Sequence, residues 1–211
     1  SMAYKGESLD LEDDFNYDDE TGLTGRLKID MPLVIPNIYL MATPLEYEEK
    51  ATRTESFEFG GETYQQDIEY DSRLTLNTYD VGLFYGVPLL ETVTLGRLDM
   101  EAGLNARIID AEALVKQDGR YEKKSETLPV PMLYVGLGLY PVERFGLEAE
   151  ARGISYGDYE LVSLLGRLKV KVVGPLFVSG GYRYDTYDIE EDDLDLDVDF
   201  SGPFLETGLK F

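Results

Sequence analysis

The sequence predicts an all-β protein, an up-and-down antiparallel transmembrane β-barrel of about ten strands (8 to 10). The first observation is the segment from Arg97 to Ile108, where apolar side chains at every second position alternate with charged or small ones. Successive side chains of a strand point to opposite faces, so this segment has one apolar and one polar face. The second is that short, proline-bearing turns alternate along the chain with mostly longer, polar loops. The third is strand length, because these segments exceed the ~5 to 6 residues of an ordinary globular strand.

Five strands are predicted in the first half of the chain. The first, Met2 to Leu11, is short, and we expect it to be incomplete. Gly22 to Met31 follows an acidic segment and alternates charged with apolar residues. Ile38 to Tyr47 begins after the turn P-L-V-I-P-N, and Gln65 to Tyr85 ends at the turn G-V-P-L-L-E. Thr92 to Val115 contains the alternating segment described above.

Five more strands are predicted in the second half. Tyr121 to Tyr140 follows the polar tip Q-D-G-R, and Phe145 to Tyr156 follows the turn Y-P-V-E-R-F. Tyr159 to Val173 comes after the brief G-D connection, and Leu176 to Asp188 after the turn V-G-P. Leu194 to Phe211 follows the acidic tip E-E-D-D. Every second connection is therefore short, which predicts a meander with one plain end and one elaborate end.

Length and composition favour a single barrel domain over residues 1–211. A chain of 211 residues fits one all-β unit, and no apolar run reaches the ~18 residues of a membrane-spanning helix. Cysteine and histidine are both absent, which removes disulfides, thiolate metal sites and the commonest general base. The net charge of −23 disfavours nucleic acid as a partner.

Alternation alone does not show whether the apolar face of the strands points out of the barrel or into it. A membrane barrel turns its apolar face to lipid, whereas a lipocalin-like soluble barrel turns it inward around a ligand. The asymmetry of the connections, the acidic loops at one end and the aromatics at the other favour the membrane. We expect these aromatics on the apolar faces, and they are Tyr79, Tyr85, Tyr140, Phe145, Phe177 and Phe211.

The charged faces would then line the lumen of the barrel. The predicted lumen-lining residues are Arg26, Lys28, Arg97, Asp99, Glu101, Arg107, Glu148, Glu150, Arg152, Arg167, Lys169, Lys171, Arg183 and Glu206. These side chains could select passing ions, or they could fill a narrow lumen with ion pairs. We favour the filling, because so few strands leave little bore and buried charges must be paired. Arg167, Lys169 and Lys171 must then find acids on neighbouring strands, or else form a positive stripe for an anion.

Three segments carry a resemblance to a known family. They are S-L-D-L-E-D-D-F-N-Y-D-D-E (Ser8 to Glu20), G-I-S-Y-G-D-Y (Gly153 to Tyr159) and D-L-D-L-D-V-D-F-S-G-P-F-L-E-T-G-L-K-F (Asp193 to Phe211). The chain resembles a family of small, largely uncharacterised outer-membrane β-barrels of Gram-negative bacteria. The resemblance implies an outer-membrane location, lipid as surroundings, and passage through the outer-membrane assembly machinery. Leu205, Leu209 and Phe211 resemble the C-terminal signal that this machinery favours.

Two acidic stretches raise the question of cations. Asp10 to Glu20 carries seven acids and Asp185 to Asp199 carries nine, with no base in either. Same-face residues of a strand are ~6.6 Å or more apart, so Asp193, Asp195, Asp197 and Asp199 do not converge on one ion. We predict solvated rims that attract cations loosely, and no metal site or cofactor.

The expected function is passive and not enzymatic. Asp99 and Glu101 could form an acid/base pair, but the flanking Arg97 and Arg107 indicate ion pairing instead. We expect a narrow pore or small-solute conduit, or a structural barrel with acidic extracellular loops. One alternative is a soluble, lipocalin-like barrel whose pocket is lined by Leu98, Met100, Leu104, Leu168 and Val170. Another is an adhesion or interaction protein that acts through its loops.

Overall fold

The computed structural model describes residues 2–4, 8–9, 22–32, 34–52, 54–59, 62–88, 90–156, 159–191 and 194–211. Its elements are β1 Met2–Tyr4, β2 Ser8–Leu9, β3 Gly22–Ile29, β4 Asn37–Thr43, β5 Glu46–Ala51, β6 Phe57–Phe59, β7 Glu62–Tyr64, β8 Tyr70–Gly86, α1 Leu90–Val93, β9 Leu98–Gln117, β10 Arg120–Val142, β11 Phe145–Tyr156, β12 Tyr159–Val173, β13 Leu176–Glu191 and β14 Leu194–Lys210. Among these elements, α1 is the one helix, and it is not long and apolar enough to cross a membrane.

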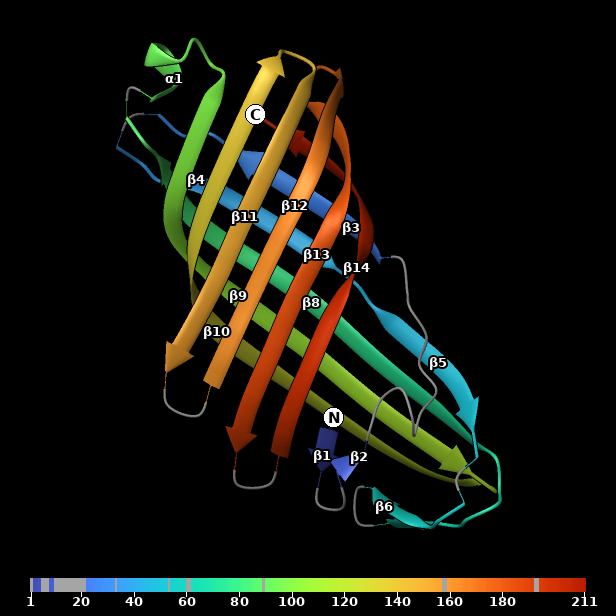
Figure 1. Ribbon diagram of the computed structural model, residues 1–211. Helices are drawn as coiled ribbons and strands as arrows, with labels where there is room; N and C mark the ends of the chain where they lie inside the picture. Colours follow the sequence, from blue (N-terminus) through green and yellow to red (C-terminus); the bar gives the residue numbers. More distant parts are fainter. Residues whose placement is uncertain are drawn as a thin grey trace.

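The strands close into a barrel, as Figure 1 shows. Each strand from β8 to β14 pairs antiparallel with the next, as in an up-and-down meander. β4 and β5 lie end to end along β8 and act as one strand interrupted at Pro44. Two backbone hydrogen bonds between Leu45 and Leu76 keep the register across the interruption. The prediction of an all-β, up-and-down barrel is therefore confirmed.

Nine strands close the barrel, and one short strand lies outside it. In a meander with an odd number of strands, the first and last strands run in the same direction. β3 and β14 accordingly pair in parallel, with Leu23 beside Leu205 and Lys28 beside Lys210. β1 pairs antiparallel with the far end of β14, outside the closed barrel. Of the predicted strand Met2 to Leu11, the described part consists of β1 and β2.

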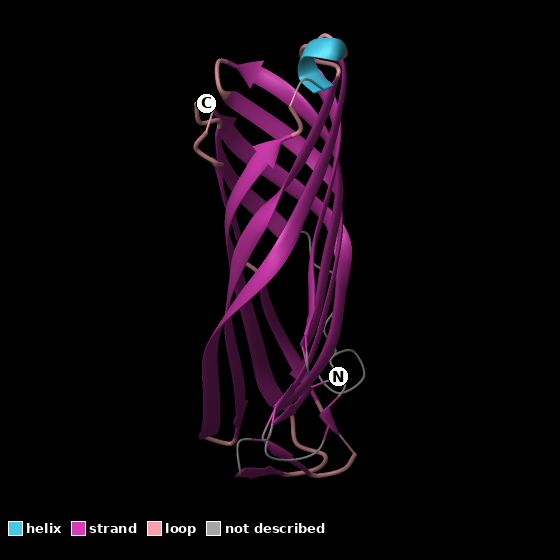
Figure 2. Cartoon of the chain, turned by 90° about the vertical axis from the view of Figure 1, so that its left-hand side faces the viewer, coloured by secondary structure: helices cyan, strands magenta, loops and turns pink. Residues whose placement is uncertain are grey.

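The two ends of the barrel differ (Figure 2). Short turns and α1 lie at one end, which we call the short-turn end. At the other end, called the outer end here, β8, β9 and β10 extend farther than β11, because β10 pairs with β11 only from Leu133 onward, while β5 accompanies β8 as far as Tyr70. Two strand starts were predicted wrongly. A turn occupies the start of the predicted strand Gln65 to Tyr85, and β8 begins at Tyr70. α1 and a turn occupy the start of the predicted strand Thr92 to Val115. The sequence L-L-E-T-V there has no alternation, and β9 begins at Leu98.

The outer face of the barrel is apolar. On β9, Leu98, Met100 and Leu104 are exposed, and Leu104 has a relative exposure of 66%. Equivalent positions on the other strands are also apolar, and they include Leu23, Leu40, Val81, Leu83, Leu133, Leu137, Leu147, Leu164, Leu168, Val178 and Leu205. Leu98, Met100, Leu104 and Leu168 therefore lie outside, where they cannot line an internal pocket.

Aromatic side chains occupy both rims of this apolar face. Tyr85, Phe145 and Phe211 are exposed near the short-turn end, while Tyr182 and Tyr184 are exposed toward the outer end, where their hydroxyls hydrogen-bond to Ser201 and Asp199. Tyr79, which was predicted near the short-turn end, instead lies at the outer edge of the apolar face, since it pairs with Ile108, the last outward apolar residue of β9 before the charged Asp110. Two further predicted positions were wrong, because Phe177 is buried and Tyr140 bonds to the lumenal Glu148. Apolar residues adjoin both, Leu176 and Val178 around Phe177 and Leu139 and Pro141 around Tyr140, so alternation could not decide which face they occupy.

Candidate functional site: the lumen of the barrel

The lumen holds a balanced set of buried charges. Six bases and six acids are buried among the described residues. The bases are Arg26, Lys28, Arg107, Arg152, Arg167 and Arg183, and the acids are Asp80, Glu101, Glu148, Glu150, Asp185 and Glu206. Each of the twelve makes at least one ion pair with another of them. Pairing offsets the high cost of removing charges from water, so the strands can bury them together.

The larger network surrounds Glu150 on β11. This carboxylate contacts Arg26 of β3 at 2.5 Å, Arg152 of its own strand at 2.6 Å and Arg167 of β12 at 2.8 Å. Arg26 and Arg167 also share Glu206 of β14, at 3.0 and 3.2 Å. The network therefore links strands on opposite sides of the lumen.

Arg167 also joins this network to Glu148, the next inward residue of β11. Lys169 contacts Glu148 at 3.0 Å, and its ammonium lies 4.2 Å from the centre of the Phe177 ring. Arg167 thus pairs with Glu148, Glu150 and Glu206, which lie on β11 and β14. Arg167 and Lys169 therefore form ion pairs with acids of other strands, and these two bases do not form a positive stripe for an anion.

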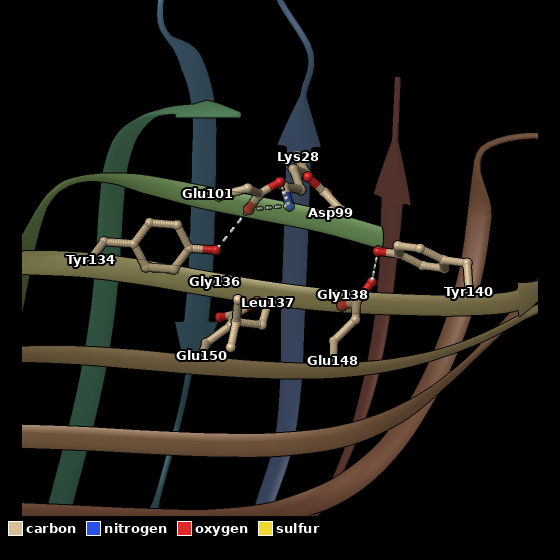
Figure 3. Close-up of a pocket in the computed structure, with 10 residues that line it drawn as sticks. All are labelled: Lys28, Asp99, Glu101, Tyr134, Gly136, Leu137, Gly138, Tyr140, Glu148 and Glu150. Carbon is tan, nitrogen blue, oxygen red and sulfur yellow. Dashed lines mark hydrogen bonds and ion pairs between the residues drawn. The ribbon is translucent and has the colours of Figure 1, made fainter. Parts of the chain in front are cut away.

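A small recess opens at the short-turn end of the lumen (Figure 3). Lys28 contacts both oxygens of Glu101 at 2.6 and 2.7 Å, and the Tyr134 hydroxyl donates to Glu101 at 2.9 Å. The Tyr140 hydroxyl donates to Glu148 at 2.5 Å across the same recess. Its free volume of about 10 Å³ is close to the room that a single water molecule needs.

A second ionic network lies farther toward the outer end. Arg107 of β9 contacts Asp80 of β8 and Asp185 of β13, each at 2.9 Å, and also bonds to Tyr187 and Ser163. Asn105 donates to Asp80 at 2.6 Å. Arg183 pairs with Asp185 and donates to Thr43 at 2.8 Å. This network again joins strands across the lumen.

Aromatic and apolar side chains fill the space around these networks. Near Glu150, the guanidinium groups of Arg26 and Arg152 each lie 4.8 Å from the centre of the Tyr39 ring, which stacks on Tyr134. Beyond Arg107, a buried apolar layer spans the lumen from several strands. This layer consists of Ile109, Val130, Met132, Leu161 and Tyr187, with Leu128, Ile154 and Phe200 packed against it.

Ten of the fourteen predicted lumen-lining residues belong to the buried ionic set; Asp99 and Lys169 are half-buried near the recess. Arg97 and Lys171 are exposed at the short-turn end, beyond the filled lumen. Arg97 precedes β9, so the alternation of that strand does not include it. The predicted lumen-lining residues did not include the acids Asp80 and Asp185, although the period of two places them on the inner faces of β8 and β13. The prediction also omitted Tyr39, Tyr134 and Asn105. It relied on charged side chains that alternate with apolar ones, and these three side chains are uncharged.

The acidic stretches and the chain end complete the set of predicted features. Asp10 to Glu20 and Asp193 lie outside the described residues, as do the side chains of Asp195 and Asp197. Within the described part of the chain, no group of three or more acids is arranged to hold a metal ion. Leu205, Leu209 and Phe211 all point outward, and the Phe211 backbone bonds to Lys28 and Asp30 of the β3 side.

Comparison with known proteins gives no relative from which a function could be transferred. No protein-family model matches the sequence, and neither the curated proteins nor the solved structures contain a match.

Proposed function

We propose that this protein is a membrane-embedded β-barrel of the bacterial outer membrane that forms no open pore. In this proposal the barrel is a structural body that carries an acidic outer end above the membrane. The observation that carries the proposal is the arrangement of the faces, with apolar side chains outside and paired charges filling the inside.

The dimensions of the outer face support the membrane location. On β9 the outward side chains are apolar or small from Leu98 to Ile108, and the first outward charge is Asp110. Eleven residues of a strand tilted by about 40° span about 25 Å along the barrel axis, which is the height of the apolar band of outer-membrane barrels. Lipid would cover this surface, and the outer-membrane assembly machinery would insert it.

The filled lumen supports a structural barrel over a conduit. A solute that crosses the lumen would have to separate the Glu150 network, then the Arg107 network, and then displace the apolar layer around Met132. Each network holds strands from opposite sides of the barrel together. Breaking a buried ion pair by removing one partner costs about 3 to 5 kcal/mol, so several simultaneous breaks oppose passage.

The described part of the outer end includes a folded hairpin. The hairpin of β6 and β7 packs Phe57 and Tyr64 against Tyr70 and Val115 in a second buried cluster. The Tyr64 hydroxyl donates to the Val115 carbonyl at 3.2 Å, and burial raises the pKa of Tyr64 to about 12. This hydroxyl therefore stays protonated and can act as a donor at any physiological pH. We propose that this end, with its surplus of acids, is the part that meets cations or surfaces.

Two measurements test the proposal. Purified protein should require detergent or lipid to remain monodisperse, and a monodisperse sample in plain buffer would contradict the membrane location. After reconstitution into planar bilayers, single-channel recording should detect no unit conductance, while a known porin in the same bilayer serves as the positive control. A stable unit conductance from the folded protein would contradict the closed lumen.

A further inference from the structure

The short-turn end exposes apolar side chains on a rigid loop. In the segment 90–97, the Thr94 hydroxyl donates to the Leu90 carbonyl at 2.7 Å and accepts from the Leu98 amide at 3.1 Å. Leu95 has a φ of 54°, followed by Gly96 at 74°, so the loop reverses tightly. It presents Val93 and Leu95 with relative exposures of 79% and 85%. Moving these exposed apolar side chains from water into an apolar environment would be favourable.

Basic side chains lie beside this loop on neighbouring strand ends. Arg97, Arg144 and Lys171 are all exposed. The Arg97 carbonyl accepts from the Tyr140 amide at 2.8 Å, which places Arg97 against the end of β10. The Lys171 amide donates to the Arg144 carbonyl at 3.0 Å, so these two residues are adjacent.

The acids beside these three bases are fewer. Of the carboxylates at this end, Asp30 pairs with Lys210 at 3.3 Å, Asp99 is half-buried near the recess, and the sequence of α1 contains Glu91. Glu143 is the exposed acid in the same turn as Arg144. The opposite end of the molecule has the reverse balance, with exposed acids that include Glu62, Asp67, Glu69, Asp118, Glu126, Glu160 and Asp188.

We infer that the short-turn end binds the headgroups of anionic phospholipids in the leaflet next to it, through Arg97, Arg144 and Lys171. The inference rests on the proposed membrane location. The apolar outer face continues directly to this rim through Leu98 and Phe145, so the rim lies at the level where hydrocarbon gives way to phosphate. There Val93 and Leu95 contact acyl chains, and the long basic side chains reach the phosphodiesters.

Lipid selectivity in reconstituted vesicles tests this inference. The protein is folded into phosphatidylcholine vesicles that contain a trace of spin-labelled phosphatidylglycerol or spin-labelled phosphatidylcholine. Electron paramagnetic resonance then measures the fraction of each lipid immobilised by the barrel. We expect the wild-type protein to prefer the anionic lipid by about fivefold, which is the size of the effect of one base that interacts with an anionic headgroup. The preference should weaken as salt is added.

The triple variant Arg97→Gln, Arg144→Gln, Lys171→Gln should lose the preference. A matched control, Lys116→Gln, Arg120→Gln, Lys123→Gln, removes the same charge from the outer end and should keep it. The inference is overturned if the wild-type protein shows no preference, if the first variant retains it, or if both variants lose it equally. Failure to insert into either kind of vesicle, read from heat-modifiable gel migration, would instead contradict the membrane location itself.

Discussion

Neutralising Glu150 should lower the free energy of unfolding of the barrel more than neutralising any exposed carboxylate. In Glu150→Gln, Arg26 keeps Glu206 and Arg167 keeps Glu148 and Glu206, but Arg152 loses the one carboxylate that it contacts among the described residues. One uncompensated ion pair at about 4 Å is worth about 4 kcal/mol at an effective dielectric constant of about 20. That value agrees with the about 3 to 5 kcal/mol lost when one partner of a buried pair is removed. We therefore expect the free energy of unfolding to fall by about 4 kcal/mol.

Urea unfolding in lipid vesicles, followed by far-UV circular dichroism, measures this loss. Circular dichroism is the suitable signal because the chain has no tryptophan. The exposed pair of Glu48 and Arg73 provides the control, and Glu48→Gln should cost about 1 kcal/mol or less. The double variant Glu150→Gln, Arg152→Gln should recover much of the loss, because it removes the unpaired cation. A loss below about 1 kcal/mol for Glu150→Gln would show that water screens the network, and would refute the closed lumen.

Three further predictions concern the outer face, strand packing and the outer end. Leu104→Arg places a charge in the middle of the apolar face and should lower the free energy of unfolding in vesicles by about 2 to 4 kcal/mol. Thr127→Arg lies beyond that face and should lower it by about 1 kcal/mol or less. Equal losses in urea unfolding would contradict the membrane location. Gly103→Ala should destabilise by about 1 to 3 kcal/mol, because its methyl group would lie 2.1 Å from the Leu83 carbonyl oxygen, while Gly166→Ala meets no atom within 4 Å and should be tolerated. The hydrogen bond from Lys50 lowers the pKa of Asp71, so Lys50→Gln should raise that pKa in an NMR titration. Because the folded pKa is depressed, the small stabilisation from this exposed pair is present at neutral pH and disappears as the pH falls through that pKa. An Asp71 pKa that does not change would contradict this assignment.

The face of each strand could be predicted from the sequence, but the pairing across the barrel could not. Alternation on β9 and β12 placed Glu101, Arg107 and Arg167 on the inner face, because side-chain direction depends only on the period of two. The partners of Arg26 depend on register and closure, since Glu150 lies 124 residues away. No local pattern encodes that distance.

The sequence pattern also could not predict which two strands pair to close the barrel. Alternation and turn spacing predicted about ten strands, but they do not indicate which edges meet. Bacterial outer-membrane barrels of a single chain usually have even strand numbers, which makes every pair antiparallel. Here β3 takes the place beside β14 and pairs in parallel over Leu23 to Lys28, while β1 covers only the far end of that edge.

The balance of charge inside the barrel explains where the net charge of the chain can reside. The chain carries a net charge of −23, yet its buried ionic set contains six acids and six bases. A net charge in the lumen would have no partner and would face the high cost of burial, so the interior must be close to neutral. Among the described residues, the acidic surplus therefore lies at the exposed ends and loops, where water solvates it. Substitutions that change the charge of the outer end should consequently leave the fold intact, whereas a change of one charge in the lumen must be matched by a second change at a residue that it contacts.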